Sequence, residues 1–331
     1  MKWQTKDNLL KVFRVIVFTA IILLIVNYIG WVFRPLNTSE AVASIKAFHS
    51  VKKDTVDVLI LGSSHAWKNV DTTEMYKEYG IAAYNYGCNW QHINTTQLFL
   101  EDALRTQKPK VVCIETYGAC EVWADKDMDG EVYYTHEIPF SSAKLKYLKQ
   151  CFVKNLERWG SYIFPIIMFH DNRNDIGKNS FKKSSIDKWL ESAGFSGNDK
   201  VKEMETQEYV KPDQFPLSTQ GQAVLDEMVE RCKANDIEIV FFTCPYFSNS
   251  YPYNDAMAEY AYENDCVYLD LFADYKNTGI STLTDFSDPG HLNSNGAKKV
   301  AHYLGDYISG HYELPDMRME GDNYWKRTFQ E

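Results

Sequence analysis

The sequence has no pair of cysteines at C-x-x-C spacing, no glycine-rich nucleotide fingerprint and no cluster with the spacing of metal ligands. It also lacks a long basic run, and its 45 acidic residues outnumber its 35 basic ones, which gives a formal net charge of -10. We therefore expect no metal, no cofactor and no nucleic acid as a partner. The seven cysteines are an odd number and several lie in apolar stretches, so we interpret them as buried small side chains.

The sequence contains enough apolar material for a packed core. Apolar residues make up 45% of the chain and aromatic residues 15%, without internal repeats or low-complexity tracts. Most of the aromatic side chains are expected in the core, and a carbohydrate-facing surface is the alternative. The 331 residues suit one large domain, or two small ones, with appendages.

One uncharged apolar stretch, 15–33, is long enough for a helix to cross the roughly 30 Å of a hydrocarbon core. Four basic residues precede it, and few follow it closely. This asymmetry predicts a single-pass anchor with a cytoplasmic N-terminus and the rest of the chain outside. A cleaved signal peptide and a buried core helix are the alternatives. The preceding basic residues are Lys2, Lys6, Lys11 and Arg14.

After the anchor, short apolar runs alternate with longer amphipathic ones, which predicts a parallel sheet covered by helices on both faces, a three-layer α/β fold. The expected strands are 56–61, 82–86, 110–115, 237–243 and 267–271. The expected helices are 72–79, 95–106, 142–155, 219–235, 254–264 and 294–309.

The expected organisation is a cytoplasmic N-terminus, an anchor, a linker, an α/β domain and a tail. We interpret 120–216 as an insertion, because it is rich in aromatic and charged residues and has weak strand signals. It is expected to be either a lid or acceptor-binding region over the site, or a peripheral helical addition. The corresponding ranges are 1–14, 15–33, 34–54, 55–310 (with the insertion inside it) and 311–331.

Parallel sheets place their ligands at the carboxyl ends of the strands, so the residues after each strand are the first candidates for chemistry. Ser64 follows the first expected strand and Gly62-Ser63, where a serine can face a crevice close to backbone amides. Taken alone, this pattern is equally typical of a turn with a helix cap.

A second candidate lies in the loop 285–293, where Asp288 and His291 stand three residues apart around Pro289-Gly290. Activating a serine requires a base within hydrogen-bond reach and a group that orients the base. One tight loop can present both side chains to the same point. The alternative is an isolated loop histidine beside an acid that caps a helix.

The order of these residues, with the nucleophile near the first strand and Asp-x-x-His near the end, resembles the SGNH (GDSL-like) hydrolases. The resemblance spans about 56–309 without the insertion and implies a flavodoxin-like fold. It implies that Ser64 is the nucleophile, His291 the base and Asp288 its orienting acid. It also implies an oxyanion hole built from the amides of Ser64 and Gly87.

The sequence departs from the family pattern at two places. Ser63 stands where the Gly-Asp-Ser motif has Asp, a variant similar to anchored relatives that transfer acyl groups to surface polymers. The block Glu115-Thr116-Tyr117-Gly118 has no Asn where the family has Gly-x-Asn-Asp. Asn89 is the candidate for the missing donor, and Glu115 is either structural or a substrate-binding carboxylate. His65 is expected to be a wall residue rather than the base.

The resemblance implies a serine O-acyl esterase or O-acyltransferase outside the membrane, which acts on a carbohydrate or cell-envelope polymer and for which acetyl is the expected acyl group. It also implies a multipass membrane O-acyltransferase as a partner. The alternative is a binding or assembly factor for polymer modification or export with a degraded site. A lipid-directed esterase at the bilayer face is a third hypothesis.

Overall fold

The computed structural model describes residues 2–34, 40–118, 129–181, 185–204, 213–245, 253–273 and 277–330. The chain divides into two compact units. The first consists of Met1–Ser39 and Phe152–Ser184, and the second of Glu40–Cys151 and Ser185–Glu331. The limits expected for the insertion, near 120 and 216, have undescribed residues beside them (119–128 and 205–212).

The first unit is built on helix α1, Lys2–Phe33, which contains the expected anchor. Its stretch Asp7–Phe33 has a mean hydropathy of 2.7 and is long and apolar enough to cross a membrane. Helix α9 (Ile166–Phe169) and the 3-10 helices η2 (His170–Asp175) and η3 (Lys178–Phe181) pack against α1, and α8 (Leu156–Ile163) packs against α9.

The second unit contains a five-stranded sheet in the order β2-β1-β3-β4-β5 in which every pair is parallel. This is the strand order of flavodoxin-like folds. The predicted three-layer α/β fold is thus confirmed, and each expected strand is present within two residues of its predicted ends. The strands are β1 Val58–Leu61, β2 Ala83–Asn85, β3 Val111–Glu115, β4 Glu238–Thr243 and β5 Val267–Asp270.

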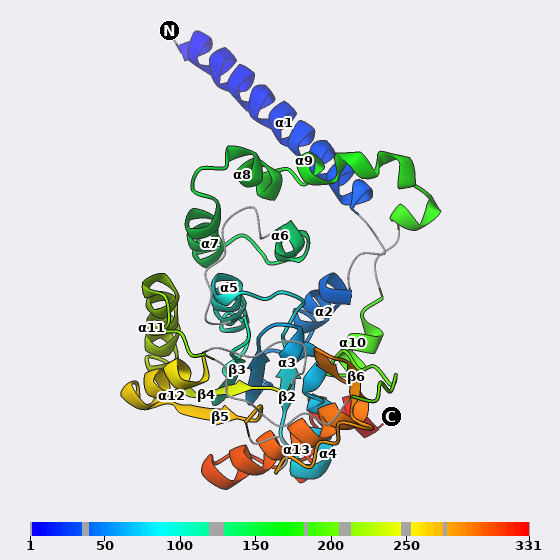
Figure 1. The fold of residues 1–331 in the computed structure, drawn as a ribbon. Coiled ribbons are helices and arrows are strands. Elements are labelled where there is room, and N and C mark those ends of the chain that lie inside the picture. Colours follow the sequence, from blue (N-terminus) through cyan, green and yellow to red (C-terminus); the bar gives the residue numbers. More distant parts are fainter. Residues whose placement is uncertain are drawn as a thin grey trace. The chain divides into compact units, whose positions relative to one another are not determined.

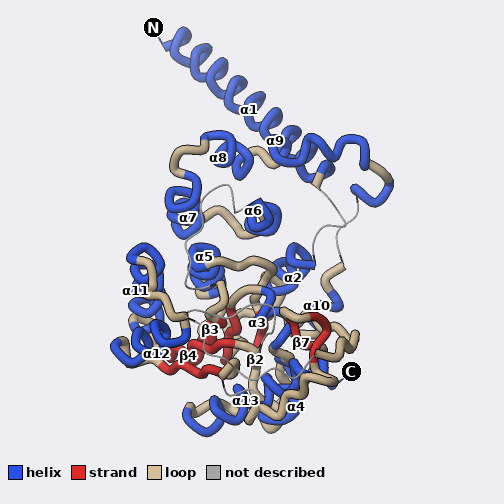
Figure 2. The backbone as a smooth tube through the Cα atoms, in the orientation of Figure 1, coloured by secondary structure: helices blue, strands red, loops and turns tan. Residues whose placement is uncertain are grey.

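Helices cover both faces of this sheet because its strands are apolar on both sides (Figures 1 and 2). One face, with Val58 and Ile60 of β1, packs on α13 and α4 through side chains such as Val300 and Leu304. On the other face α5 and α11 contact β1 and β4. Alternate residues of each buried strand therefore serve different layers.

The six expected helices are present with their ends shifted by at most three residues. They are α4 Thr72–Tyr79, α5 Ile93–Ala103, α7 Ser142–Phe152, α11 Thr219–Lys233, α12 Asn254–Glu263 and α13 Ser294–His311. The described chain adds α3 Ser64–Asn69, α6 Asp129–Thr135, α10 Asp187–Glu191 and α14 Tyr324–Gln330, with the antiparallel pair β6 Phe286–Asp288 and β7 His291–Leu292.

Two stretches expected to be a linker and a tail contain packed structure. Helix α2 (Glu40–Phe48) lies in the expected linker, and its Phe48 is fully buried and stacked on Tyr86 at 3.9 Å between ring centroids. In the expected tail, Trp325 of α14 is buried and its indole N–H donates to the carbonyl of Thr55. A few large apolar side chains in short, polar-looking stretches are enough to dock a helix.

Trp67 of α3 packs against Trp189 of α10, and this packing gives a stability prediction. Its side chain is buried, its Nε1–H donates to the Gly194 carbonyl at 2.9 Å, and its ring stacks on Trp189. We expect Trp67→Ala to lower the free energy of unfolding by about 3–5 kcal/mol through cavity formation and the lost hydrogen bond. Denaturant unfolding of the full chain in detergent measures this, and the exposed Tyr262→Ala is the control. A loss below about 1 kcal/mol would contradict the packing.

Candidate active site

The turn after β1 is shaped by Gly62. Its φ is +139°, a conformation that side-chain-bearing residues rarely adopt, and a Cβ there would lie 2.7 Å from Glu115 Cβ. Ser63 then caps α3 by accepting a hydrogen bond from the His65 amide at 3.2 Å. Ser64, half-buried, is thereby placed as the first residue of α3 at the carboxyl edge of the sheet.

Asp288 and His291 face each other across the β6–β7 hairpin, whose turn is Pro289-Gly290. The Gly290 amide donates to Asp288 Oδ1 at 2.8 Å, which closes the turn. Ser287 adds hydrogen bonds from its hydroxyl to the carbonyls of His291 and Leu292. The hairpin therefore holds both side chains on a short and well-braced element.

The three predicted triad residues form one hydrogen-bonded chain. Ser64 Oγ lies 2.8 Å from His291 Nε2, and His291 Nδ1 lies 2.9 Å from Asp288 Oδ1. An ionised carboxylate can only accept, so the neutral imidazole carries its proton on Nδ1 and offers Nε2 to the serine hydroxyl. This is the arrangement in which a serine can lose its proton to a base that is already oriented.

Asn69, at the last turn of α3, couples the serine helix to the histidine strand. Its Oδ1 accepts a hydrogen bond of 2.9 Å from the amide of Leu292, and its side chain is fully buried. Since Ser64 begins α3 and His291 precedes Leu292, this bond fixes the two catalytic candidates relative to each other. The sequence analysis missed Asn69, because no local pattern distinguishes it from a polar helix residue.

Burial and neighbouring charges set the protonation of the pair. Burial, together with Lys68, lowers the pKa of His291 below its ordinary value, although Asp288 acts in the opposite direction. Burial would raise the pKa of Asp288, but the Gly290 amide and His291 outweigh it and hold that pKa below its usual range. At neutral pH the site therefore contains a neutral imidazole and a carboxylate.

The three residues predicted for the oxyanion hole differ in how their hydrogen-bond donors are engaged. In the described part of the chain no protein acceptor takes the Ser64 amide. The Gly87 amide, however, donates to Asn85 Oδ1 at 3.1 Å. The side chain of Asn89 is exposed, and none of the described contacts joins it to the triad. Gly87 and Asn89 as oxyanion donors therefore stay predictions.

Glu115 lies beneath the nucleophile turn and is fully buried, which rules out its interpretation as an exposed substrate-binding carboxylate. Ser63 Oγ donates to its Oε2 at 3.1 Å, and the Tyr117 amide donates to its Oε1 at 3.0 Å. The Cys244 amide is a further donor, so the carboxyl joins the carboxyl ends of β1, β3 and β4. Burial outweighs these donors and raises the pKa of Glu115 to about 8.

His65 lies beside the triad without replacing its base. Its ring is buried, packs at a tilt of 43° on Tyr117 at 4.1 Å and meets His291 edge-on at 5.5 Å between centroids. Burial, with help from His291, lowers the pKa of His65 to about 3, so the ring is neutral. The Ser64 hydroxyl bonds to His291, and His65 forms part of the wall, as expected.

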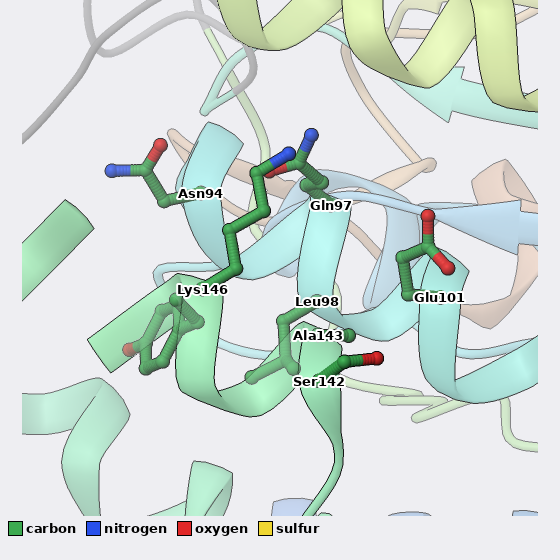
Figure 3. A pocket seen from close by; sticks show the side chains of 8 residues that line it. Asn94, Gln97, Leu98, Glu101, Ser142, Ala143 and Lys146 are labelled. Carbon is green, nitrogen blue, oxygen red and sulfur yellow. The ribbon is translucent and has the colours of Figure 1, made fainter. Parts of the chain in front are cut away.

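A cavity of about 180 Å³ lies between α5 and α7 and is distinct from this site (Figure 3). Gln97 and Lys146, both at its lining, donate to Glu227 of α11, so their polar ends are engaged in holding three helices together. No triad residue lines it. Within the described ranges, no three His, Cys, Asp or Glu side chains are grouped to hold a metal ion.

No protein-family model matches the chain, and no curated protein matches it. Similar solved structures include a GDSL-like lipase from Bacteroides thetaiotaomicron, at 10% identity and a TM-score of 0.39, covering 81% of this chain and 96% of that one. An acetylxylan esterase from Geobacillus stearothermophilus, solved as a catalytic mutant, has 12% identity and a TM-score of 0.38, covering 79% and 96%.

The strand order, the serine after β1 and the Asp-x-x-His hairpin near the end together define an α/β protein that resembles the SGNH, or GDSL-like, hydrolases. The sequence pattern and the arrangement of the strands and triad residues both support this resemblance. What the site can do chemically is inferred from the positions of its own side chains.

Glu115 gives a pH prediction that does not depend on activity. Its pKa is raised from an ordinary 4.5 to about 8, so between these values the folded state binds a proton that the unfolded state has lost. The contribution of Glu115 to stability therefore falls as pH rises from about 4.5 to 8, by up to about 1.4 kcal/mol per pH unit. We expect Glu115→Gln to remove this slope, as measured by denaturant unfolding at pH 5 and pH 8. Parallel slopes in the parent and the variant would contradict a neutral buried carboxyl.

Proposed function

We propose that the chain is a serine esterase of the SGNH type that cleaves or transfers an acyl group. The observation that carries this proposal is the continuous hydrogen-bonded chain from Ser64 through His291 to Asp288 at the carboxyl edge of the sheet. Ser64 and His291 are both partly exposed, so a substrate can reach them. A site of this kind supports acyl transfer without a cofactor.

In the proposed reaction Ser64 Oγ attacks the acyl carbonyl while His291 Nε2 takes the hydroxyl proton. The carbon–oxygen bond to the leaving alcohol breaks, and His291 returns the proton to that alcohol, leaving an acyl-serine. Water or an acceptor hydroxyl then attacks the acyl-serine as His291 removes its proton, and the proton returns to Ser64. Asp288 orients the ring and stabilises the imidazolium.

The negative oxygen that develops needs hydrogen-bond donors. The Ser64 amide is suited to this role, because it has no protein acceptor in the described chain. The Gly87 amide would have to exchange its bond with Asn85 for one with the substrate oxygen. Losing one such donor typically costs on the order of 10²–10³ in rate, so this exchange would control how active the site is.

We further propose that α1 is an uncleaved membrane anchor, with the second unit on the extracytoplasmic side. Its length and apolar composition, and the basic residues before it, support this assignment. An enzyme held there would meet cell-envelope polymers. We propose an acylated, and in particular acetylated, carbohydrate polymer as substrate, and a multipass membrane O-acyltransferase as partner.

A binding or assembly factor is the second candidate function. It is favoured by one observation, the internal acceptor that Asn85 provides for the Gly87 amide, which leaves a single described donor for an oxyanion. Such a protein would retain the triad but bind the acylated polymer without turning it over.

The first test measures acetyl release from a chromogenic acetyl ester by the full chain in detergent. We expect Ser64→Ala and His291→Ala each to lower kcat/KM by about 10³-fold or more, and the double variant to be no worse than either alone, because the residues act as a unit. His311→Ala, an exposed histidine at the end of α13, is the matched control.

Equal activity in the parent and Ser64→Ala would overturn the assignment of the nucleophile. An inactive parent that binds an acetylated oligosaccharide, with binding weakened by Ser64→Ala, would favour the binding factor.

The pH profile tests the state of the base. Since burial lowers the pKa of His291 below its ordinary 6.5, the acid limb of kcat/KM should be centred below pH 6.5. In Asp288→Asn the acid limb of the residual activity should shift to still lower pH, because the carboxylate that raises the pKa of His291 is gone. A limb centred above pH 6.5 in the parent would contradict this environment.

A further inference from the structure

The last turns of α1 are in close contact with the segment 165–172. A Cβ at Gly30 would lie 2.7 Å from the backbone nitrogen of Ile166, so the two backbones approach as closely as glycine allows. Asn172 Nδ2 donates to the carbonyl of Phe33 at 3.2 Å, near the end of the helix. The close approach at Gly30 and the bond from Asn172 fix the segment to one end of α1.

This attachment sets the depth of the segment in a bilayer. With a rise of 1.5 Å per residue, Gly30 lies about 4.5 Å before Phe33 along the helix axis. In a spanning helix this is the boundary between hydrocarbon and headgroups, where Tyr28 and Trp31 also lie. Residues packed against Gly30 must then be at the same level.

The elements at this level expose large apolar side chains. Leu156 and Ile163, two turns apart on the same face of α8, are 85% and 49% exposed, and Phe181 of η3 is 55% exposed. The residues between them on α8 include Glu157 and Arg158, which lie on another face. Gly160, on the apolar side, meets the side chain of Ile167 in α9. Thus α8 is amphipathic, packed on α9, and presents unpaired apolar surface.

We propose that Leu156, Ile163 and Phe181 form a lipid-binding surface that lies in the outer interface of the membrane beside α1. This inference rests on the proposed function only where it places α1 across a membrane. The occupant is the bilayer, because α8 packs on α9 and α9 packs on the end of the helix that would span the membrane. Amphipathic helices bind an interface in this way, with the apolar face toward the acyl chains and charged residues toward water.

A surface of this kind would have a physical consequence. A single helix lets the attached chain tilt and rotate at the bilayer, whereas a second point of contact restrains both motions. The first unit would then act as a platform at the membrane rather than as a bare tether.

The test places a photo-crosslinking phenylalanine analogue at single positions of the full chain in phosphatidylcholine nanodiscs. Leu156 and Ile163 are the test positions, and Glu157 and Arg158 on the other face of α8 are the matched controls. Leu24, exposed within α1, reports whether that helix is in the bilayer. All four positions on α8 are in the same helix, so differences between them report its orientation.

We expect lipid adducts at Leu156 and Ile163 to exceed those at the two controls by about fivefold or more. Adducts at Leu24 with none at Leu156 and Ile163 would overturn the proposed surface while leaving the anchor intact. Protein adducts at these two positions would likewise overturn it, in favour of a protein contact. Absence of adducts at Leu24 would overturn both, because the spanning helix itself would be wrong.

Discussion

Parallel pairing of β1 with β2 on one side and β3 on the other places the nucleophile turn and the glutamate beneath it. The register Ile60↔Asn85 and Leu61↔Ile114 brings the ends of the three strands level, so that Gly62 and Glu115 meet at one edge. Helix α3 starts at that edge with Ser64. A shift of one residue in the register of β1 would turn the serine away from His291 and bury it.

The sheet and the triad could be predicted because their signals are local. Buried parallel strands are continuous apolar runs, and five such runs were enough to give the fold class. Ser64 and the Asp288–His291 pair were each weak alone. Their order along the chain resembles that of the SGNH hydrolases, and this resemblance predicted that they act together. In the structure Ser64 Oγ lies 2.8 Å from His291 Nε2, and His291 Nδ1 lies 2.9 Å from Asp288 Oδ1.

The supporting residues could not be predicted, because they depend on contacts between distant segments. Asn69 and Leu292 are 223 residues apart, and nothing near either one indicates the bond between them. The bond from the Gly87 amide to Asn85 Oδ1 likewise has no signal in the sequence around either residue. Asn85 Nδ2 also donates to the carbonyls of Ala66 and Val70. These two bonds hold the Asn85 side chain where its Oδ1 accepts from the Gly87 amide.

These supporting contacts explain how the site can depart from the SGNH sequence pattern that it resembles and still hold its geometry. With Ser63 in place of Asp, the nucleophile turn has no carboxylate of its own, but Glu115 reaches it from β3. The Glu115 carboxyl comes from a neighbouring strand and is buried, and burial at this position favours its neutral form. No extra negative charge then lies beneath Ser64 to oppose the one that develops on the substrate oxygen. Ser63 at the turn and Glu115 beneath it therefore act together. The neutral carboxyl of Glu115 holds the turn that carries Ser64 and adds no charge to the site.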